Sequence, residues 1–233
     1  MGSLERRKAE TAYGYCLIML SLNFAGRPNG LKILCLGAHC DDIEIGCGGT
    51  IIRLIKENDI EHLRWVVFTS SGERGDEAKK SAEFFAQGCK EKEIIIKRFK
   101  DGFLPYEARE IKNLFEDLKP SNPDLIFTHC RSDLHQDHRT VCELTWNTFR
   151  SHLIFEYEIP KYDGDLGSPN LFVTLAKEVA ERKIETIMKC FQSQAGKQWF
   201  DRETFFGLMR IRGIESASQT KYAEGFYVRK TVM

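Results

Sequence analysis

The sequence of 233 residues lacks several features that would assign it to a particular class of protein. It has no excess of either charge, because 34 Lys and Arg residues balance 34 Asp and Glu residues. This balance gives no electrostatic argument for a nucleic-acid partner or an anionic membrane surface. No run approaches the ~20 apolar residues of a membrane-spanning helix. With 42% hydrophobic residues, no repeats and no low-complexity linker, the composition is that of an ordinary globular protein.

Cysteine is present eight times, but never as a C-x-x-C pair, so a cysteine zinc site is not expected. The cysteines are spread over a mid-sized chain, and several fall inside predicted strands and helices. This distribution differs from that of a small secreted domain, in which the same number of cysteines would suggest a disulfide framework. We interpret them as reduced, mostly buried thiols of a cytoplasmic protein.

The first residues have some features of a signal peptide. Basic residues precede an apolar run at residues 15–20. However, that run is short, polar residues interrupt the segment after it, and no small-x-small cleavage site is present. We therefore interpret residues 1–30 as an N-terminal extension and residues 31–233 as one domain.

Hydrophobic periodicity predicts strands that alternate with helices along most of the chain. Such alternation implies right-handed crossovers and a mostly parallel sheet with helices on both faces, in a single α/β domain. After residue 160 the pattern weakens, and the aromatic C-terminal part is expected to pack on the first part. The predicted strands are 31–36, 63–69, 93–99, 124–128 and 153–157, and the predicted helices are 48–56, 76–87, 107–118, 138–149 and 175–190.

Polar and ionisable side chains gather directly after four of the predicted strands. In an open parallel sheet, ligands bind beyond the carboxyl ends of the strands. Three of the six histidines lie within residues 129–138, where two of them alternate with acids. Imidazole and carboxylate, with few thiolates, form the ligand set of a hydrolytic zinc site that keeps an open position. These residue types therefore predict a metal site at this edge of the sheet.

Two motifs resemble the signatures of the PIG-L/LmbE-like de-N-acetylase family. The first, Ala38-His39-Cys40-Asp41-Asp42-x-Glu44 with Gly46-x-Gly48-Gly49, is similar to the family's A-H-P-D-D-x-E-x-G-x-G-G signature. The second, Asp133-x-His135-x-Asp137-His138, comes later in the chain in the expected order, and weaker similarity extends from residue 31 to residue 224. The resemblance implies a Rossmann-like fold. It also implies zinc-dependent hydrolysis of the N-acetyl group of an N-acetylglucosamine-type sugar or conjugate.

The resemblance assigns the metal ligands residue by residue. His39, Asp42 and His138 match the ligands of Zn²⁺ or another divalent metal ion. Such an ion lowers the pKa of its bound water toward 7 and polarises an amide carbonyl. The implied partner is a small amino-sugar substrate, and some relatives of this kind assemble, so a homo-oligomer is one of the expected states.

The catalytic roles carry over in the same way. Asp41 matches the general base, since a carboxylate not bound to the metal can take the proton of the water. His135 matches the histidine that stabilises the tetrahedral intermediate or protonates the leaving amine. Asp137 matches the acid that holds this histidine.

Other residues near the motifs leave two interpretations open. Glu73 and Arg74 come after the second predicted strand, where they either contact substrate or cap the next helix. His129 is interpreted as a packing residue at a strand end rather than as a ligand. The glycines at positions 46, 48 and 49 are interpreted as structural rather than phosphate-binding.

The sequence departs from the family at Cys40, where the family usually has proline. We interpret Cys40 as a harmless small replacement, because its neighbours already fill the ligand roles. An alternative enzyme is a cysteine hydrolase with Cys40 as nucleophile and His135 or His138 as base. A further alternative is a non-catalytic nucleotide-binding module, although the glycines here lack G-x-G-x-x-G spacing.

Overall fold

The computed structural model describes residues 22–24 and 28–232. The predicted extension and its apolar run lie almost entirely outside these residues. Within them, seven strands form one sheet, and no helix is long and apolar enough to span a membrane. The strands are β1 (Leu31–Gly37), β2 (Ile60–Thr69), β3 (Glu91–Phe99), β4 (Leu125–His129), β5 (Leu153–Tyr157), β6 (Leu171–Leu175) and β7 (Tyr222–Tyr227).

The strand order across the sheet is β3-β2-β1-β4-β5-β7-β6. The first five strands are parallel, so their carboxyl ends meet at one edge, whereas β7 runs antiparallel to both β5 and β6. This arrangement confirms the predicted Rossmann-like, mostly parallel sheet. The central strand β1 lies between β2 and β4, which places the residues after these three strands next to one another.

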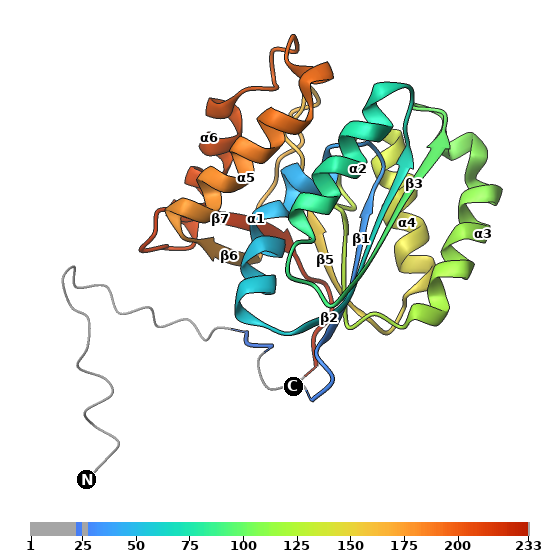
Figure 1. Cartoon of the computed structure of the whole chain (residues 1–233), viewed down its shortest axis with the longest axis horizontal. Coiled ribbons are helices and arrows are strands. Elements are labelled where there is room, and N and C mark those ends of the chain that lie inside the picture. Colours follow the sequence, from blue (N-terminus) through green and yellow to red (C-terminus); the bar gives the residue numbers. More distant parts are fainter. Residues whose placement is uncertain (1–21, 25–27, 233) are drawn as a thin grey trace.

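Helices cover both faces of the sheet, as Figure 1 shows. Strand β1 alternates between two cores, since Ile33 and Cys35 pack on one face and Leu34 and Leu36 on the other. The α-helices are α1 (Asp42–Glu57), α2 (Glu73–Phe85), α3 (Ala108–Leu118), α4 (Gln136–Thr148), α5 (Lys177–Cys190) and α6 (Arg202–Glu215). Helices α3 and α4 cover one face, and α1, α2, α5 and α6 contribute to the core on the other.

Three short 3₁₀ helices occur in the described residues: η2 (Leu104–Glu107), η3 (Lys119–Ser121) and η4 (Gln192–Gln194). The predicted positions of the five parallel strands and of helix α3 are close to those observed. Strands β6 and β7 and helix α6 were not predicted. Strands β6 and β7 pair with each other, and β7 also pairs with β5. Pairing between distant segments stabilises these strands, and their sequences have no strong strand pattern.

Helix α1 begins six residues before the predicted start at position 48. Glycine disfavours helix locally, but close packing requires it here. A Cβ atom at Gly46 would lie 2.2 Å from the ring of Tyr157, and one at Gly49 would lie 2.5 Å from Leu175. The glycines therefore let α1 approach the sheet, as the structural interpretation predicted.

Seven cysteines lie within the described residues, and all of them are free. Six are buried and Cys89 is half-buried. Burial raises the pKa of each thiol for which a shift is resolved, as at Cys89, where the value rises to about 11. This agrees with the prediction of reduced, mostly buried thiols for this part of the chain.

Candidate active site

The two sequence motifs meet at the carboxyl edge of the sheet because β1 and β4 are neighbouring parallel strands. The first motif forms the turn after β1 and the first two turns of α1. The second forms the loop after β4 and the first turn of α4. His39 is 9% exposed, whereas Asp42 and His138 are 3% and 2% exposed. The site is thus an acid–histidine cluster at the end of the central strands.

Three donor atoms converge in this cluster. Nδ1 of His39 lies 3.0 Å from Nε2 of His138 and 3.4 Å from Oδ2 of Asp42. The distance between Nε2 of His138 and Oδ2 of Asp42 is 3.5 Å. Ligand atoms bound tetrahedrally to one zinc ion lie roughly 3.3–3.4 Å apart, given metal–ligand bonds of about 2.0–2.1 Å. The spacing of the three predicted ligands therefore fits one such ion.

Each histidine of this triangle has a carboxylate at its other ring nitrogen. Nε2 of His39 lies 3.1 Å from Oδ1 of Asp101 and 3.3 Å from Oδ2 of Asp137. Nδ1 of His138 lies 2.9 Å from Oδ2 of Asp133. Metal-binding histidines almost always have such a partner, which fixes the tautomer and the ring orientation. The outer contacts therefore support the same ligand set.

The charge states also suit a cation. Burial alone would raise the pKa of Asp42, but the imidazoles of His138, His129 and His39 outweigh it and hold this pKa well below its usual range. Burial and the neighbouring His129 lower the pKa of His138 to about 4, so its imidazole is neutral. An ionised carboxylate and a neutral imidazole are the forms that bind metal.

The third ligand shows that the cluster attracts positive charge. Burial would lower the pKa of His39, but the facing carboxylates of Asp42, Asp101 and Asp137 raise it well above its usual value. The surrounding acids therefore favour a positive charge at this point, which a proton or a bound cation can supply. The charge environment of His39 therefore also fits a divalent ion.

A second grouping, formed by Asp42, His129 and His138, is less suited to an ion. His129 approaches Asp42 and stacks on His138, with ring centroids 3.9 Å apart. However, its Nε2 accepts the backbone N–H of Ala38 at 2.9 Å, so that nitrogen has no lone pair for a metal. The interpretation of His129 as a packing residue agrees with this contact. The His129 ring also stacks on His138 and so helps to hold this proposed metal ligand in place. The sequence did not reveal this contact.

His135 lies beside the triangle rather than within it. Its ring is 4.8 Å from that of His39 and 4.6 Å from that of His138, between ring centroids. Its Nδ1 accepts the backbone N–H of Asp137 at 3.2 Å and caps α4. The proton of the neutral ring is therefore on Nε2. His135 is also close enough to join His39 and His138 around an ion.

The hydrogen bonds of Asp137 go to groups other than the His135 ring. Its carboxylate accepts the backbone N–H groups of Gly102 and Leu104, at 2.7 and 3.1 Å, and lies beside Nε2 of His39. Its contact with His135 is made by the backbone N–H and not by the carboxylate. The Asp137 carboxylate therefore braces His39 and the loop after β3 by hydrogen bonds, and it acts on His135 through its charge.

Asp41 is buried beside the triangle and is paired with Arg74. Nη2 of Arg74 lies 3.2 Å from Oδ1 of Asp41, whereas Oδ2 is buried without a hydrogen-bond partner. Burial and the neighbouring Asp42 raise the pKa of Asp41, and Arg74 opposes that rise. Arg74 therefore faces the site through its ion pair with Asp41. Glu73 is exposed at the start of α2 and forms no ion pair with the site residues described.

Three further side chains were given no role from the sequence, although two of them contact predicted site residues and the third contacts one of those two. They are Asp101, Asp133 and Lys161, and Lys161 lies 2.9 Å from Asp133. Asp101 comes soon after β3 and Asp133 belongs to the second motif, so position in the chain was a usable signal for both. Lys161 had no comparable signal, because it lies in an irregular loop.

The thiol of Cys40 does not form a catalytic pair with either proposed histidine. Its Sγ donates to the backbone oxygen of Thr69 at 3.3 Å, and the side chain is 1% exposed. Burial raises its pKa to about 12, so the thiol stays protonated and is a poor nucleophile. This geometry argues against the cysteine hydrolase.

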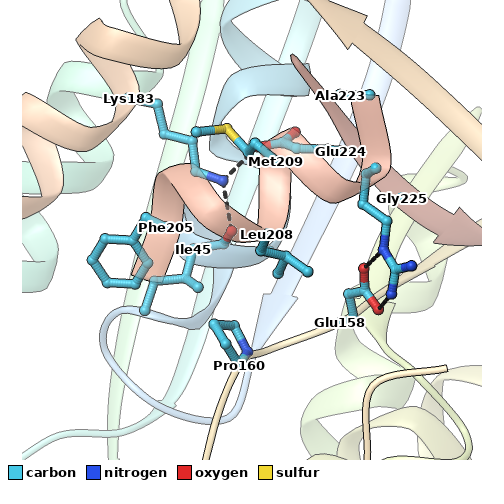
Figure 2. A pocket seen from close by; sticks show the side chains of 12 residues that line it. Ile45, Glu158, Pro160, Lys183, Phe205, Leu208, Met209, Ala223, Glu224 and Gly225 are labelled. Atoms are coloured by element: carbon cyan, nitrogen blue, oxygen red, sulfur yellow. Dashed lines mark hydrogen bonds and ion pairs between the residues drawn. The ribbon is translucent and has the colours of Figure 1, made fainter. Parts of the chain in front are cut away.

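A separate recess lies on the other side of α1, between α5, α6 and β7, as Figure 2 shows. Its cavity volume is only about 10 Å³, room for about one water molecule. Its charged groups already have partners: Nζ of Lys183 contacts Glu224 and the carbonyl of Ile45, and Arg212 forms a bidentate pair with Glu158. Glu224 also accepts the backbone N–H groups of residues 49 and 50. These pairs fix α1, which carries Asp42, and leave no charge free for a ligand.

The fold and the site define a Rossmann-like α/β enzyme with an acid–histidine centre that could bind a metal ion. Residues 34–149 match the family model described as PIG-L: GlcNAc-PI de-N-acetylase. The chain belongs to this family, as its two motifs predicted.

Similar proteins include deacetylases and a hydratase. The "Uncharacterized deacetylase YaiS" of Escherichia coli (strain K12) is 26% identical over 182 residues, which cover 72% of this chain and 94% of that protein. The N,N'-diacetylchitobiose deacetylase from Pyrococcus horikoshii has a similar structure, with a TM-score of 0.66 and 22% identity over 86% of this chain and 84% of that one. The 4-carboxy-2-hydroxymuconate hydratase GalB from Pseudomonas putida KT2440 matches with a TM-score of 0.69 and 17% identity, over 87% and 98% of the two chains. The fold alone therefore does not determine the reaction.

Proposed function

We propose that this protein is a metal-dependent deacetylase that removes the N-acetyl group from an N-acetylglucosamine-type sugar or conjugate. The observation that supports this proposal best is the triangle formed by His39, Asp42 and His138 beside the buried, unpartnered carboxylate oxygen of Asp41. Zinc is the proposed ion, because imidazole nitrogen and carboxylate oxygen suit it.

The reaction is hydrolysis of an amide. A bond forms between the oxygen of a water molecule and the acetyl carbon, and the bond from that carbon to nitrogen breaks. The products are acetate and a free primary amine. A divalent ion bound by the triangle would polarise the amide carbonyl and make the attacking water more acidic.

Asp41 is proposed to accept a proton from the attacking water. Its Oδ2 has no hydrogen-bond partner in the protein, so this oxygen is available to a substrate-bound water. The raised pKa of Asp41 increases its basicity above that of an exposed aspartate. Arg74 holds the other oxygen and so orients the carboxylate. A general base positioned in this way contributes on the order of 10²–10⁴ to the rate.

His135 is proposed to act on the opposite side of the reaction. Its Nδ1 is occupied by the backbone at the start of α4, so its Nε2 is the nitrogen that can donate a proton. This proton would stabilise the oxyanion of the tetrahedral intermediate or pass to the leaving amine. Protonation of the amine requires the ring to be protonated at both nitrogens, so Nδ1 would give up its contact with the backbone. Burial and the nearby His39 lower the pKa of His135, which makes this form a stronger acid.

The amino-sugar part of the proposal is supported by related proteins. The family model is named for GlcNAc-PI, and the Pyrococcus relative is named for diacetylchitobiose. Both names describe N-acetylated glucosamine units. The site chemistry alone would suit other amides, so the substrate class depends on these relationships.

The proposal is tested by incubating metal-loaded protein with a panel of N-acetylglucosamine conjugates and measuring acetate and new primary amine. We expect both products in equal amounts from at least one conjugate, and their loss in Asp41→Asn. Cleavage of a different amide or ester would support the proposal of a metal-dependent hydrolase and contradict the proposal of an amino-sugar substrate. If the protein cleaved none of the compounds but bound nucleotides, the result would favour the alternative of a non-catalytic nucleotide-binding module.

A further inference from the structure

Three charged side chains form a buried cluster beside the proposed metal site. Nζ of Lys161 lies 2.9 Å from Oδ2 of Asp133 and 2.5 Å from Oδ2 of Asp165. The side chains are 13%, 2% and 5% exposed in that order. Charges buried to this degree are costly unless they are paired, so the three groups depend on one another for their positions. The catalytic steps proposed above give no role to Lys161 or Asp165.

Asp133 connects this cluster to the proposed metal ligand His138. The oxygen that contacts Lys161, Oδ2, also lies 2.9 Å from Nδ1 of the His138 ring. The other oxygen accepts the backbone N–H of His135 at 2.8 Å. The carboxylate is therefore held by an ammonium group, an imidazole and a backbone amide. Its orientation determines where the His138 ring points.

Lys161 reaches this position from a separate segment of the chain. It lies in the loop at residues 158–170, between β5 and β6, where the structure has no helix or strand. Asp165 belongs to the same loop and accepts the backbone N–H of Leu134 at 2.7 Å. Tyr162 and Leu166, which lie next to these contacts in sequence, are 74% and 44% exposed. Polar contacts rather than these apolar side chains fix this part of the loop.

We propose that Lys161 is a positioning residue for His138 and acts through Asp133. The inference rests on the metal site of the proposed function. A carboxylate at the second nitrogen of a histidine ligand sets its orientation and basicity. Without Lys161, the carboxylates of Asp133 and Asp165 would lie close together with no counter-ion between them. Repulsion would move Asp133, and the His138 ring would lose its anchor.

The test compares metal binding by Lys161→Met and by the unaltered protein in the absence of substrate. Zn²⁺ affinity is measured by competition with a chelator, and the Co²⁺-loaded protein is examined by electronic absorption. We expect Lys161→Met to weaken zinc binding about tenfold, the low end of the effect of outer partners, and to change the Co²⁺ absorption bands. Lys161→Arg keeps the charge and should restore both properties. Lys177→Met removes a surface ion pair with Glu181 and is the matched control.

Unchanged zinc affinity and an unchanged Co²⁺ spectrum in Lys161→Met would overturn the inference. The melting temperature of the metal-free proteins is measured alongside, because a purely structural role would lower it without altering the bands. If Lys161→Met does not fold, Lys161→Gln is judged by the same two readouts. If the unaltered protein binds no divalent ion, the proposed function fails first and the inference with it. If metal binding depends on Lys161 but no substrate is cleaved, the inference stands and the proposed reaction fails.

Discussion

Nδ1 of His39 and Nε2 of His138 lie 3.0 Å apart, although 99 positions separate the two residues in the sequence. Two uncharged imidazoles gain little from facing nitrogen to nitrogen unless a proton or a cation lies between them. Both nitrogens also face Oδ2 of Asp42, at 3.4 and 3.5 Å. This arrangement predicts that a cation stabilises the site.

The first prediction concerns metal content. The purified protein should bind close to one divalent ion per chain, and a strong chelator should abolish activity. His138→Ala should lose most of the ion, because it removes one of three converging donors. Elemental analysis checks the content, with His62→Ala as the control, since His62 lies in β2 away from the motifs. Full metal content in His138→Ala would exclude it as a ligand.

The second prediction separates two neighbouring carboxylates. Asp41→Asn should keep the metal and the fold but lower kcat by about 10²–10⁴, the usual contribution of a general base. Asp42→Ala should lower metal affinity instead, because its oxygen belongs to the donor triangle. Both quantities are measured for both variants. If Asp41→Asn lost the metal and Asp42→Ala kept it, the two assignments would be exchanged.

The third prediction concerns Cys40. Its protonated, buried thiol donates to a backbone oxygen, so Cys40→Ala and Cys40→Pro should retain substantial activity and full metal content. Alkylation by iodoacetamide should be slow in the folded protein. A Cys40→Ala variant that bound metal normally but had no turnover would support the cysteine hydrolase.

The fourth prediction concerns pH. Asp41 must be ionised to accept a proton, so kcat/KM should fall as the pH drops through its pKa. Arg74 lowers this pKa, and Arg74→Met should therefore raise it and move the acidic limb of the profile to higher pH. The exposed Arg109→Met is the control, for which we expect no shift. An acidic limb that stayed in place in Arg74→Met would show that another group controls it.

The fifth prediction depends on the hydrogen bonds of Asp137. Its carboxylate contacts His39 and the backbone of Gly102 and Leu104. Asp137→Asn should therefore weaken metal binding and increase hydrogen exchange at residues 101–104. The basic limb of the pH profile, which we assign to His135, should remain. If that limb flattened while metal affinity stayed constant, Asp137 would act through His135 after all.

Much of this fold could be predicted from local patterns. Buried strands have short apolar runs, and helix α3 has apolar residues at i, i+3, i+4 and i+7, so these elements were found close to their observed bounds. The start of α1 was missed because three glycines disfavour helix locally. Strands β6 and β7 were missed because their pairing joins segments about fifty residues apart, which no local window contains.

The candidate site, too, could be predicted from the sequence only in part. The sequence by itself determined which chemical groups are present and that two motifs come after two strands, because in a parallel sheet those ends share one edge. It also identified the family. Only the tertiary structure decided which atoms face one another. It turned the Asp137 carboxylate toward His39, placed Arg74 on Asp41 and brought Lys161 to Asp133 from a loop without periodicity. Side-chain direction and long-range ion pairs depend on the packing of several elements at once, and sequence spacing does not encode that packing locally.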